Sequence, residues 1–136
     1  MIGFEVSNEL YTFVRNRVKA IYSSVTFADA YQGQETFPIC TFSMRDDSIN
    51  TSRIDSGNIE NAVNVMVEVN VYSNKISGKK AEATEIMGAV DESMRIKGFT
   101  RIMCQPIENQ ADATIYRMVA RFTATIDAKH NTFIRR

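Results

Sequence analysis

The sequence predicts an α+β fold: a largely antiparallel or mixed β-sheet of four to five strands, with two α-helices packed on one face. Valine occupies every odd position from Val63 to Val71, which is the two-residue period of a strand with one buried side. The segment 116–126 alternates in the same way. Two other segments repeat apolar residues every three or four positions, as amphipathic helices do. This succession of elements is typical of a single α+β domain.

The first helical segment lies near the N-terminus. Its apolar face consists of Val6, Leu10, Phe13, Val14, Val18 and Ile21. Ser7 or Asn8 has a side chain suited to cap its start. A short strand is predicted within residues 23–31, SSVTFADAY, and a better one within residues 36–44, TFPICTFSM. Because Pro38 has no N–H to donate, we expect it at the beginning of that strand or on a sheet edge.

Residues 46–61, DDSINTSRIDSGNIEN, are predicted to form a polar loop. Three isoleucines interrupt a run of Asp, Ser, Asn, Thr, Gly, Arg and Glu. A connection of this length inside a compact domain is usually functional or disordered. We expect it to contact a partner molecule, and a solvated hairpin tip is the alternative. The candidate contact residues are Ile49, Arg53, Ile54, Asp55, Asn58 and Ile59.

A second helix is predicted to follow the valine-rich strand. Its apolar face consists of Ala83, Ile86, Met87, Val90 and Met94. Gly98 is placed to end this helix in the left-handed conformation, with Phe99 folding back on Met94. A strand, a helix and a further strand in succession suggest a right-handed crossover.

The last predicted elements are two strands that form a hairpin. The first is FTRIMCQP, residues 99–106, ended by Pro106, and the second is TIYRMVARFTATID, residues 114–127. We expect both helices to cover the valine face of the sheet. The whole chain, residues 1–136, is predicted to be one domain with a flexible C-terminal tail over about 128–136.

The side of the sheet away from the helices is expected to be mixed in character. Strand alternation places there Asn64, Met66, Glu68 and Asn70 from one strand, and Arg117, Val119 and Arg121 from the last. A solvated sheet face has a similar composition. We favour an interface between subunits, because two apolar side chains would otherwise be exposed among charges that can pair across a boundary. The interface candidates are Glu68, Met66, Arg117, Val119 and Arg121.

The chain carries no net charge, because 16 Lys and Arg residues balance 16 Asp and Glu residues. We therefore expect no nucleic acid and no anionic membrane as its ligand, and little self-repulsion to oppose association. Its N-terminal segment lacks the pattern of a signal peptide. Cys40 and Cys104 each lie in a strand-like run between apolar residues, so both are predicted to be buried thiols.

The residues offer no catalytic, cofactor or metal constellation. Residues 73–84 lie where a phosphate-binding loop would, but Ser73 and Lys80 stand where that motif requires glycine and Ser or Thr. His130 is the only histidine, so it lacks the partners of a zinc site. We expect a protein that is not an enzyme and that uses no cofactor or metal. Lys79 and Lys80 oppose the dipole of the second helix and are either a solvated helix end or a contact with an acidic partner.

Several segments of the sequence resemble those of a known protein family. They are VYSNKISGKKAEA after the long strand, GAVDESM followed by KGFTR, the proline of QP, and the closing strand TIYRMVARFTATID. Through them, residues 66–127 resemble the tail-completion proteins of long-tailed bacteriophages with flexible, non-contractile tails, also called tail terminators or head-to-tail joining proteins. The N-terminal helix and the polar loop occur in the matching order, so the resemblance extends over nearly the whole chain.

The resemblance implies an α+β subunit that assembles into a ring, typically a hexamer. Such a ring caps the finished tail tube and offers a surface to the head-completion or connector protein on the portal. It implies a place in the virion at the head-proximal end of the tail, and in the host cytoplasm during assembly. Other phage neck and minor tail proteins share a similar outline. A small-molecule-binding regulatory module is the alternative from another class.

Overall fold

The computed structural model describes residues 2–28, 36–49, 62–107, 114–127 and 132–133. They form two helices and six strands, and the sheet order is β1-β2-β3-β5-β4, with β6 pairing with β5. The elements are α1 (Ile2–Ile21), β1 (Thr26–Ala28), β2 (Ile39–Ile49), β3 (Ala62–Ser73), α2 (Lys79–Ile96), β4 (Thr100–Ile107), β5 (Tyr116–Asp127) and β6 (Thr132–Phe133).

The sheet is mixed, as predicted. Strand β1 is parallel to β2, and the remaining pairs are antiparallel. Strand β3 occupies the middle: it pairs with β2 along one side and with the whole of β5 along the other. Strands β4 and β5 form the expected hairpin, and β5 lies between β3 and β4. The chain therefore passes over β5 in the connection from β3 to β4 that contains α2.

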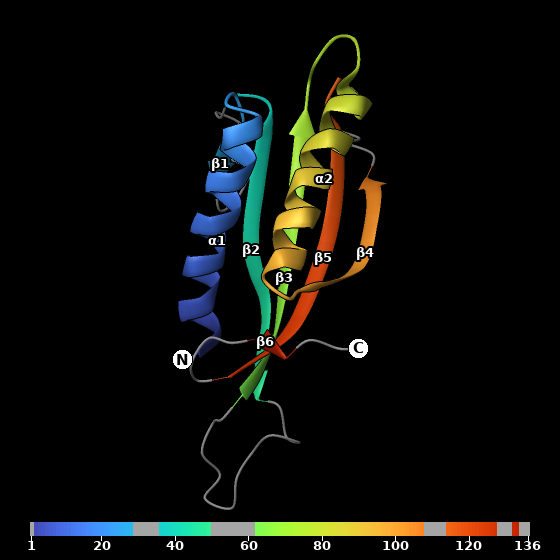
Figure 1. The fold of residues 1–136 in the computed structure, drawn as a ribbon. Coiled ribbons are helices and arrows are strands. Elements are labelled where there is room, and N and C mark those ends of the chain that lie inside the picture. Colours follow the sequence, from blue (N-terminus) through green and yellow to red (C-terminus); the bar gives the residue numbers. More distant parts are fainter. Residues whose placement is uncertain (1, 29–35, 50–61, 108–113, 128–131, 134–136) are drawn as a thin grey trace, which may run out of the picture.

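Both helices lie on the same face of the sheet, with α1 towards β2 and α2 over β3 and β5 (Figure 1). The five valines of β3 from Val63 to Val71 are completely buried on this face. Phe122 and Ile126 of β5 join them in one apolar core. The helices contribute Leu10, Val14 and Val18 from α1, and Ala83, Ile86, Met87, Val90 and Met94 from α2. The α+β class and the packing of two helices on the valine face are confirmed.

Several predicted boundaries were wrong. Helix α1 begins at Ile2, before the two residues expected to cap it. Strand β2 extends to Ile49, so residues 46–49 of the expected loop pair with β3 instead. Pro106 does not end β4, which continues to Ile107. A proline is tolerated there because β4 lies at the edge of the sheet. In the expected C-terminal tail, Thr132–Phe133 pair with β5 as β6.

The two cysteines differ in their surroundings. Cys40 is completely buried, and this burial raises the pKa of its thiol. Cys104 is exposed, so the prediction that it would be buried was wrong. It lies on β4, where only one side of the strand is paired in the sheet.

Helix α2 ends as predicted, in a Schellman cap. The backbone N–H of Phe99 donates to the carbonyl of Met94 (3.0 Å), and that of Gly98 donates to Arg95 (2.9 Å). Gly98 adopts a φ of 83°, in the left-handed region. Phe99 and Met94 are both buried in the core. The turn therefore delivers the chain from the helix layer into β4 while satisfying the last carbonyls of the helix.

We expect Gly98→Ala to destabilise the fold by about 1 kcal/mol, because a Cβ disfavours the left-handed conformation. The matched control is Gly88→Ala in the middle of α2. A Cβ there meets nothing within 4 Å, and alanine is the better helix former by about 1 kcal/mol. Thermal unfolding should give opposite shifts in Tm for the two variants. Equal shifts would contradict this account of the cap.

Candidate interaction surface

The face of the sheet opposite the helices carries a chain of polar side chains across its three central strands. Pairing places Glu68 of β3 directly between Ser43 of β2 and Arg121 of β5. Two residues further along β3, Asn70 pairs with Val119. Neither helix of the described chain lies on this face (Figure 1). The strand alternation predicted from the sequence therefore brings these residues together on one surface.

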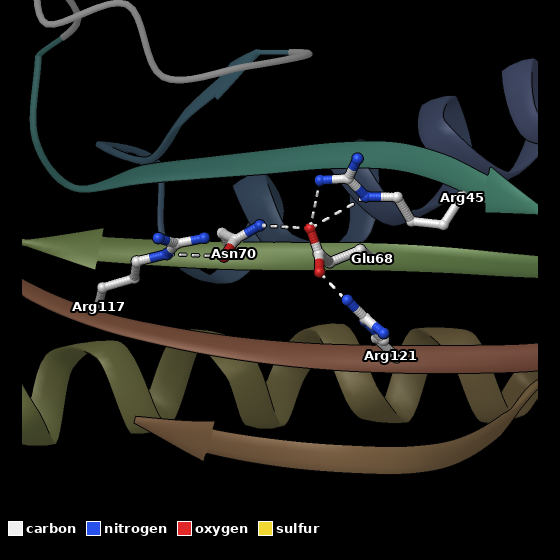
Figure 2. Close-up of polar contacts among 5 residues, drawn as sticks. All are labelled: Arg45, Glu68, Asn70, Arg117 and Arg121. Atoms are coloured by element: carbon white, nitrogen blue, oxygen red, sulfur yellow. Dashed lines mark hydrogen bonds and ion pairs between the residues drawn. The ribbon is translucent and has the colours of Figure 1, made fainter. Parts of the chain in front are cut away.

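Glu68 is the centre of this surface (Figure 2). Arg45 donates from Nε (3.2 Å) and Nη2 (2.7 Å) to its Oε2 atom. Arg121 donates from Nε to Oε1 (3.1 Å). The Asn70 amide donates a longer bond of 3.5 Å to Oε2. Both carboxylate oxygens thus accept charge-assisted hydrogen bonds, and the three arms come from β2, β3 and β5.

Arg117 extends the network along β5. Its Nε donates to Oδ1 of Asn70 (2.9 Å), so the Asn70 side chain accepts from Arg117 and donates to Glu68. The guanidinium carbon of Arg117 also lies 5.5 Å from the centroid of the Tyr72 ring, in cation–π range. Tyr72 is the cross-strand partner of Arg117. Pairing across two strands therefore fixes the direction of this arginine.

Burial and charge act in opposite directions on Glu68. Its side chain is only 7% exposed, whereas those of Arg45 and Arg121 are 56% and 44% exposed. Burial by itself raises the pKa of the carboxyl, but the hydrogen bonds from Arg45 and Arg121, the charge of Arg45 and the Asn70 amide outweigh it. The net pKa of Glu68 lies below its ordinary value. The carboxylate therefore stays ionised and pairs with half-exposed cations.

This cluster has the properties of a binding surface more than those of an acid–base site. A carboxylate with a lowered pKa that already accepts several hydrogen bonds is a poor proton acceptor. The guanidinium groups, in contrast, retain donors: each of Arg117 and Arg121 uses only Nε among the hydrogen bonds formed by the described residues. Two guanidinium groups contact the Glu68 carboxylate and a third contacts Asn70, so cations outnumber carboxylates within this network. The surface is thus suited to an acidic partner.

The predicted interface residues have different environments in the structure. Glu68, Arg117 and Arg121 belong to the network. Met66 lies two residues before Glu68 on β3 and is partly buried. Val119 is 2% exposed, so the expectation that it would be exposed in a single subunit was wrong. It lies between the two arginines on β5 and opposite Asn70. Exposed apolar side chains therefore support a subunit interface on this face less than predicted. The charged side chains of the network support it more.

Arg45 is the functional candidate that sequence reasoning missed. It falls between the strand predicted within residues 36–44 and the expected loop 46–61, and no role was predicted for it. In the structure β2 continues, and its pairing with β3 shifts between Met44 and Asp46, so that Arg45 lies at a bulge. The signal was present in the alternation of β2, because Thr41 and Ser43 precede Arg45 at intervals of two residues, while Cys40 and Phe42 point into the core.

The remaining predicted contact residues are only partly within the described chain. Ile49 is the last residue of β2, and Arg53, Ile54, Asp55, Asn58 and Ile59 are outside the described residues. Lys80 is exposed in the first turn of α2. This exposure fits both a solvated helix end and a contact with an acidic partner. Lys79 donates from Nζ to the carbonyl of Thr114 (3.5 Å), which ties the start of α2 to the segment before β5.

Other kinds of site find little support among the described residues. They contain no group of three or more His, Cys, Asp or Glu side chains placed to hold a metal ion. Neither described helix is long and apolar enough to cross a membrane. A hollow of about 280 Å³ near the start of β4 is lined by neutral side chains and one glycine: Asn64, Gly98, Thr100, Ile102, Thr123, Ala124 and Thr125. Its lining supplies hydroxyl and amide groups but no acid–base pair.

Comparison with known proteins identifies the fold. No protein-family model and no curated protein matches the chain. Among solved structures, the fold is similar to that of a chain in the virion of a native gene transfer agent particle. The TM-score is 0.57 at 12% sequence identity, and the match covers 87% of this chain and 94% of that one. The two chains share one fold over nearly their full lengths.

We expect Glu68→Gln to destabilise the folded chain by about 1–3 kcal/mol at neutral pH, because it removes the charge that compensates two arginines. Since the pKa of Glu68 is lowered by folding, its contribution is present above the unfolded pKa of about 4.3 and is lost as the pH falls through the folded value. Urea unfolding between pH 3 and 7 should therefore show a smaller pH dependence for the variant. The exposed Glu85→Gln is the control, and an equal change in both would contradict the assignment.

Proposed function

We propose that this chain is a structural virion protein of a phage-type particle. In this proposal it assembles into a ring, typically a hexamer, that caps the tail tube and joins the tail to the head-completion or connector protein. The observation that carries the proposal is the near full-length similarity to a chain of a gene transfer agent virion. The resemblance of residues 66–127 to tail-completion proteins favours the head-proximal end of the tail over other positions in the particle.

The geometry of the sheet supports assembly. A cluster that keeps a buried carboxylate ionised and holds arginines half-exposed provides charge for a partner without offering a reactive group. Pairing and hydrogen bonds already restrict these arginines, so less side-chain entropy is lost when a partner binds. A sheet face that neither described helix covers, with directed charges, is thus a suitable contact surface for another subunit or for a neighbouring virion protein.

The size of the chain is compatible with a ring. Its accessible surface is 8115 Å². A head-to-tail contact on each side, burying about 800 Å² per subunit at each, would cover roughly a fifth of that area. Head-to-tail contacts must close, because an open series of them extends into a filament. The absence of net charge leaves little repulsion among the copies.

We expect the purified chain to form a species of about 92 kDa, six copies of 15.4 kDa each, and to bind the open end of isolated tail tubes. Light scattering after size exclusion over a hundredfold concentration range gives the mass, and electron microscopy shows rings and capped tubes. A monomer that assembles only on tubes is also compatible with the proposal. A chain that forms no ring and leaves tubes uncapped refutes it.

We expect removal of residues 52–59 to leave the fold intact and to impair attachment of tails to heads. The deleted segment lies within the polar stretch that follows β2, and its isoleucines and charges are the candidate partner contacts. Circular dichroism tests the fold, and counts of joined and free tails in complemented lysates test function. Normal joining by the deleted chain would show that the segment is only a connection.

A further inference from the structure

The connection between β3 and α2 projects beyond the ends of the strands (Figure 1). It consists of residues 74–78, and we call it the Ile76 tip. Ile76 is 104% exposed, whereas the other exposed large hydrophobic side chains of the described chain are 51–59% exposed. Single exposed apolar residues are common on protein surfaces. The surroundings of Ile76 therefore decide whether it is a contact for a partner.

Hydrogen bonds hold the chain on the β3 side of Ile76. Ser73 is completely buried at the end of β3, and its hydroxyl donates to the carboxylate of Glu82 in α2 (2.8 Å). The same hydroxyl oxygen accepts from the backbone N–H of Lys75 (3.4 Å). The residue before Ile76 is thus tied to a buried side chain that also bonds to the helix.

The start of α2 fixes the other side of the tip. Gly78 has a φ of 87°, a left-handed conformation that glycine adopts without strain. Its carbonyl accepts from the backbone N–H of Glu82 (2.9 Å), and Lys79 donates from Nζ to the carbonyl of Thr114 (3.5 Å). Ile76 therefore lies between two anchored positions, so little backbone entropy is lost when a partner covers it.

Lysines accompany the isoleucine in the tip and the first turn of α2. Residues 74–82 contain Lys75, Lys79 and Lys80 and one acid, Glu82. Lys75 and Lys80 are exposed, whereas Lys79 and Glu82 are partly buried. The next exposed acid along the chain, Glu85, lies further into α2. The exposed charges of this segment are thus both positive, and they flank a completely exposed apolar side chain.

The tip lies at one end of the molecule. β6, the last residues of β2 and the first residues of β3 lie at the opposite end (Figure 1). That opposite end leads into residues 50–61, whose middle is expected to act in the attachment of tails to heads. A subunit that joins two neighbours needs a contact surface for each. The end that carries Ile76 is therefore suited to the second neighbour, the tail tube.

We propose that the Ile76 tip docks on the open end of the tail tube, in an apolar pocket whose rim carries carboxylates. Ile76 fills the pocket, and Lys75 and Lys80 pair with the rim. This inference rests on the proposed function and names the part of the chain that contacts the tube. Burial of the isoleucine slows dissociation, and the exposed lysines speed association with an acidic surface.

The first test removes the apolar side chain. We expect Ile76→Ser to raise the chain concentration that half-saturates isolated tail tubes about 10- to 100-fold, because a buried isoleucine is lost. Ile76→Val keeps most of the apolar surface, so its shift should be only about 4-fold. Ile96→Ser is the matched control, since Ile96 is also exposed but lies in the last turn of α2. Co-sedimentation with the tubes measures binding.

The second test reverses the exposed lysines. Lys75→Glu/Lys80→Glu should slow association with the tubes about 10-fold or more at low salt, because the rim then repels the tip. Raising the salt concentration should bring this variant closer to the wild type, since salt screens exposed charges. Arg15→Glu/Lys19→Glu on α1 changes the net charge by the same amount and is the control. Stopped-flow light scattering gives the association rates.

The outcomes separate this contact from the proposed function. Binding of Ile76→Ser to tubes with wild-type affinity would overturn the docking of the tip while leaving the capping role intact, and so would an equal loss in Ile96→Ser. Failure of Ile76→Ser to form rings would assign the tip to a second copy of this chain and overturn the tube contact. Normal capping with a loss of head joining would assign the tip to the connector and overturn it too. A wild-type chain that does not bind tubes refutes the proposed function itself.

Discussion

The alternation of side chains along β3 is the constraint on which the rest of the structure depends. This strand pairs along its length with β2 on one edge and with β5 on the other. It is therefore a central strand, and its side chains point alternately to the two faces of the sheet. Its valines are completely buried under the helices, and its polar residues must therefore point to the opposite face. A shift of pairing by one residue would expose the valines and bury Glu68 in an apolar core. The core thus fixes the register, and the register fixes the polar surface.

Glu68 shows how a charged residue is accommodated at the centre of a sheet. An ion at such a position loses hydration, and only well-placed partners compensate for the loss. Here the partners come from the two strands that flank β3, with Arg121 directly opposite and Arg45 at a bulge. Such a pairing adds little stability compared with a hydrophobic residue of similar size. Its contribution is to orient the guanidinium groups, because Glu68 holds both arginines in positions where a partner surface can contact them.

Two properties of the described chain support the proposed role in virion assembly. The described chain presents a sheet face that neither helix covers and that carries directed cations, and its fold is similar to that of a chain in a gene transfer agent virion. In an assembly protein, surface residues are expected to determine specificity, since such a protein functions by binding other subunits at defined places. The two helices cover the apolar face of the same sheet. Among the described elements, the polar face and the outer sides of the helices are therefore the surfaces that remain for partners.

The sequence alone determined the element types, the helix-covered face and the cap at Gly98, because period-two and helical patterns and a left-handed glycine are local properties. It also placed Glu68, Arg117 and Arg121 on one face. Only the tertiary structure decided that β2 continues to Ile49, that Arg45 joins Glu68, and that Val119 is buried while Cys104 is exposed. These depend on which strands become neighbours and which become edges. Burial and ion pairing are set by residues far apart in the chain, and no local pattern contains that information.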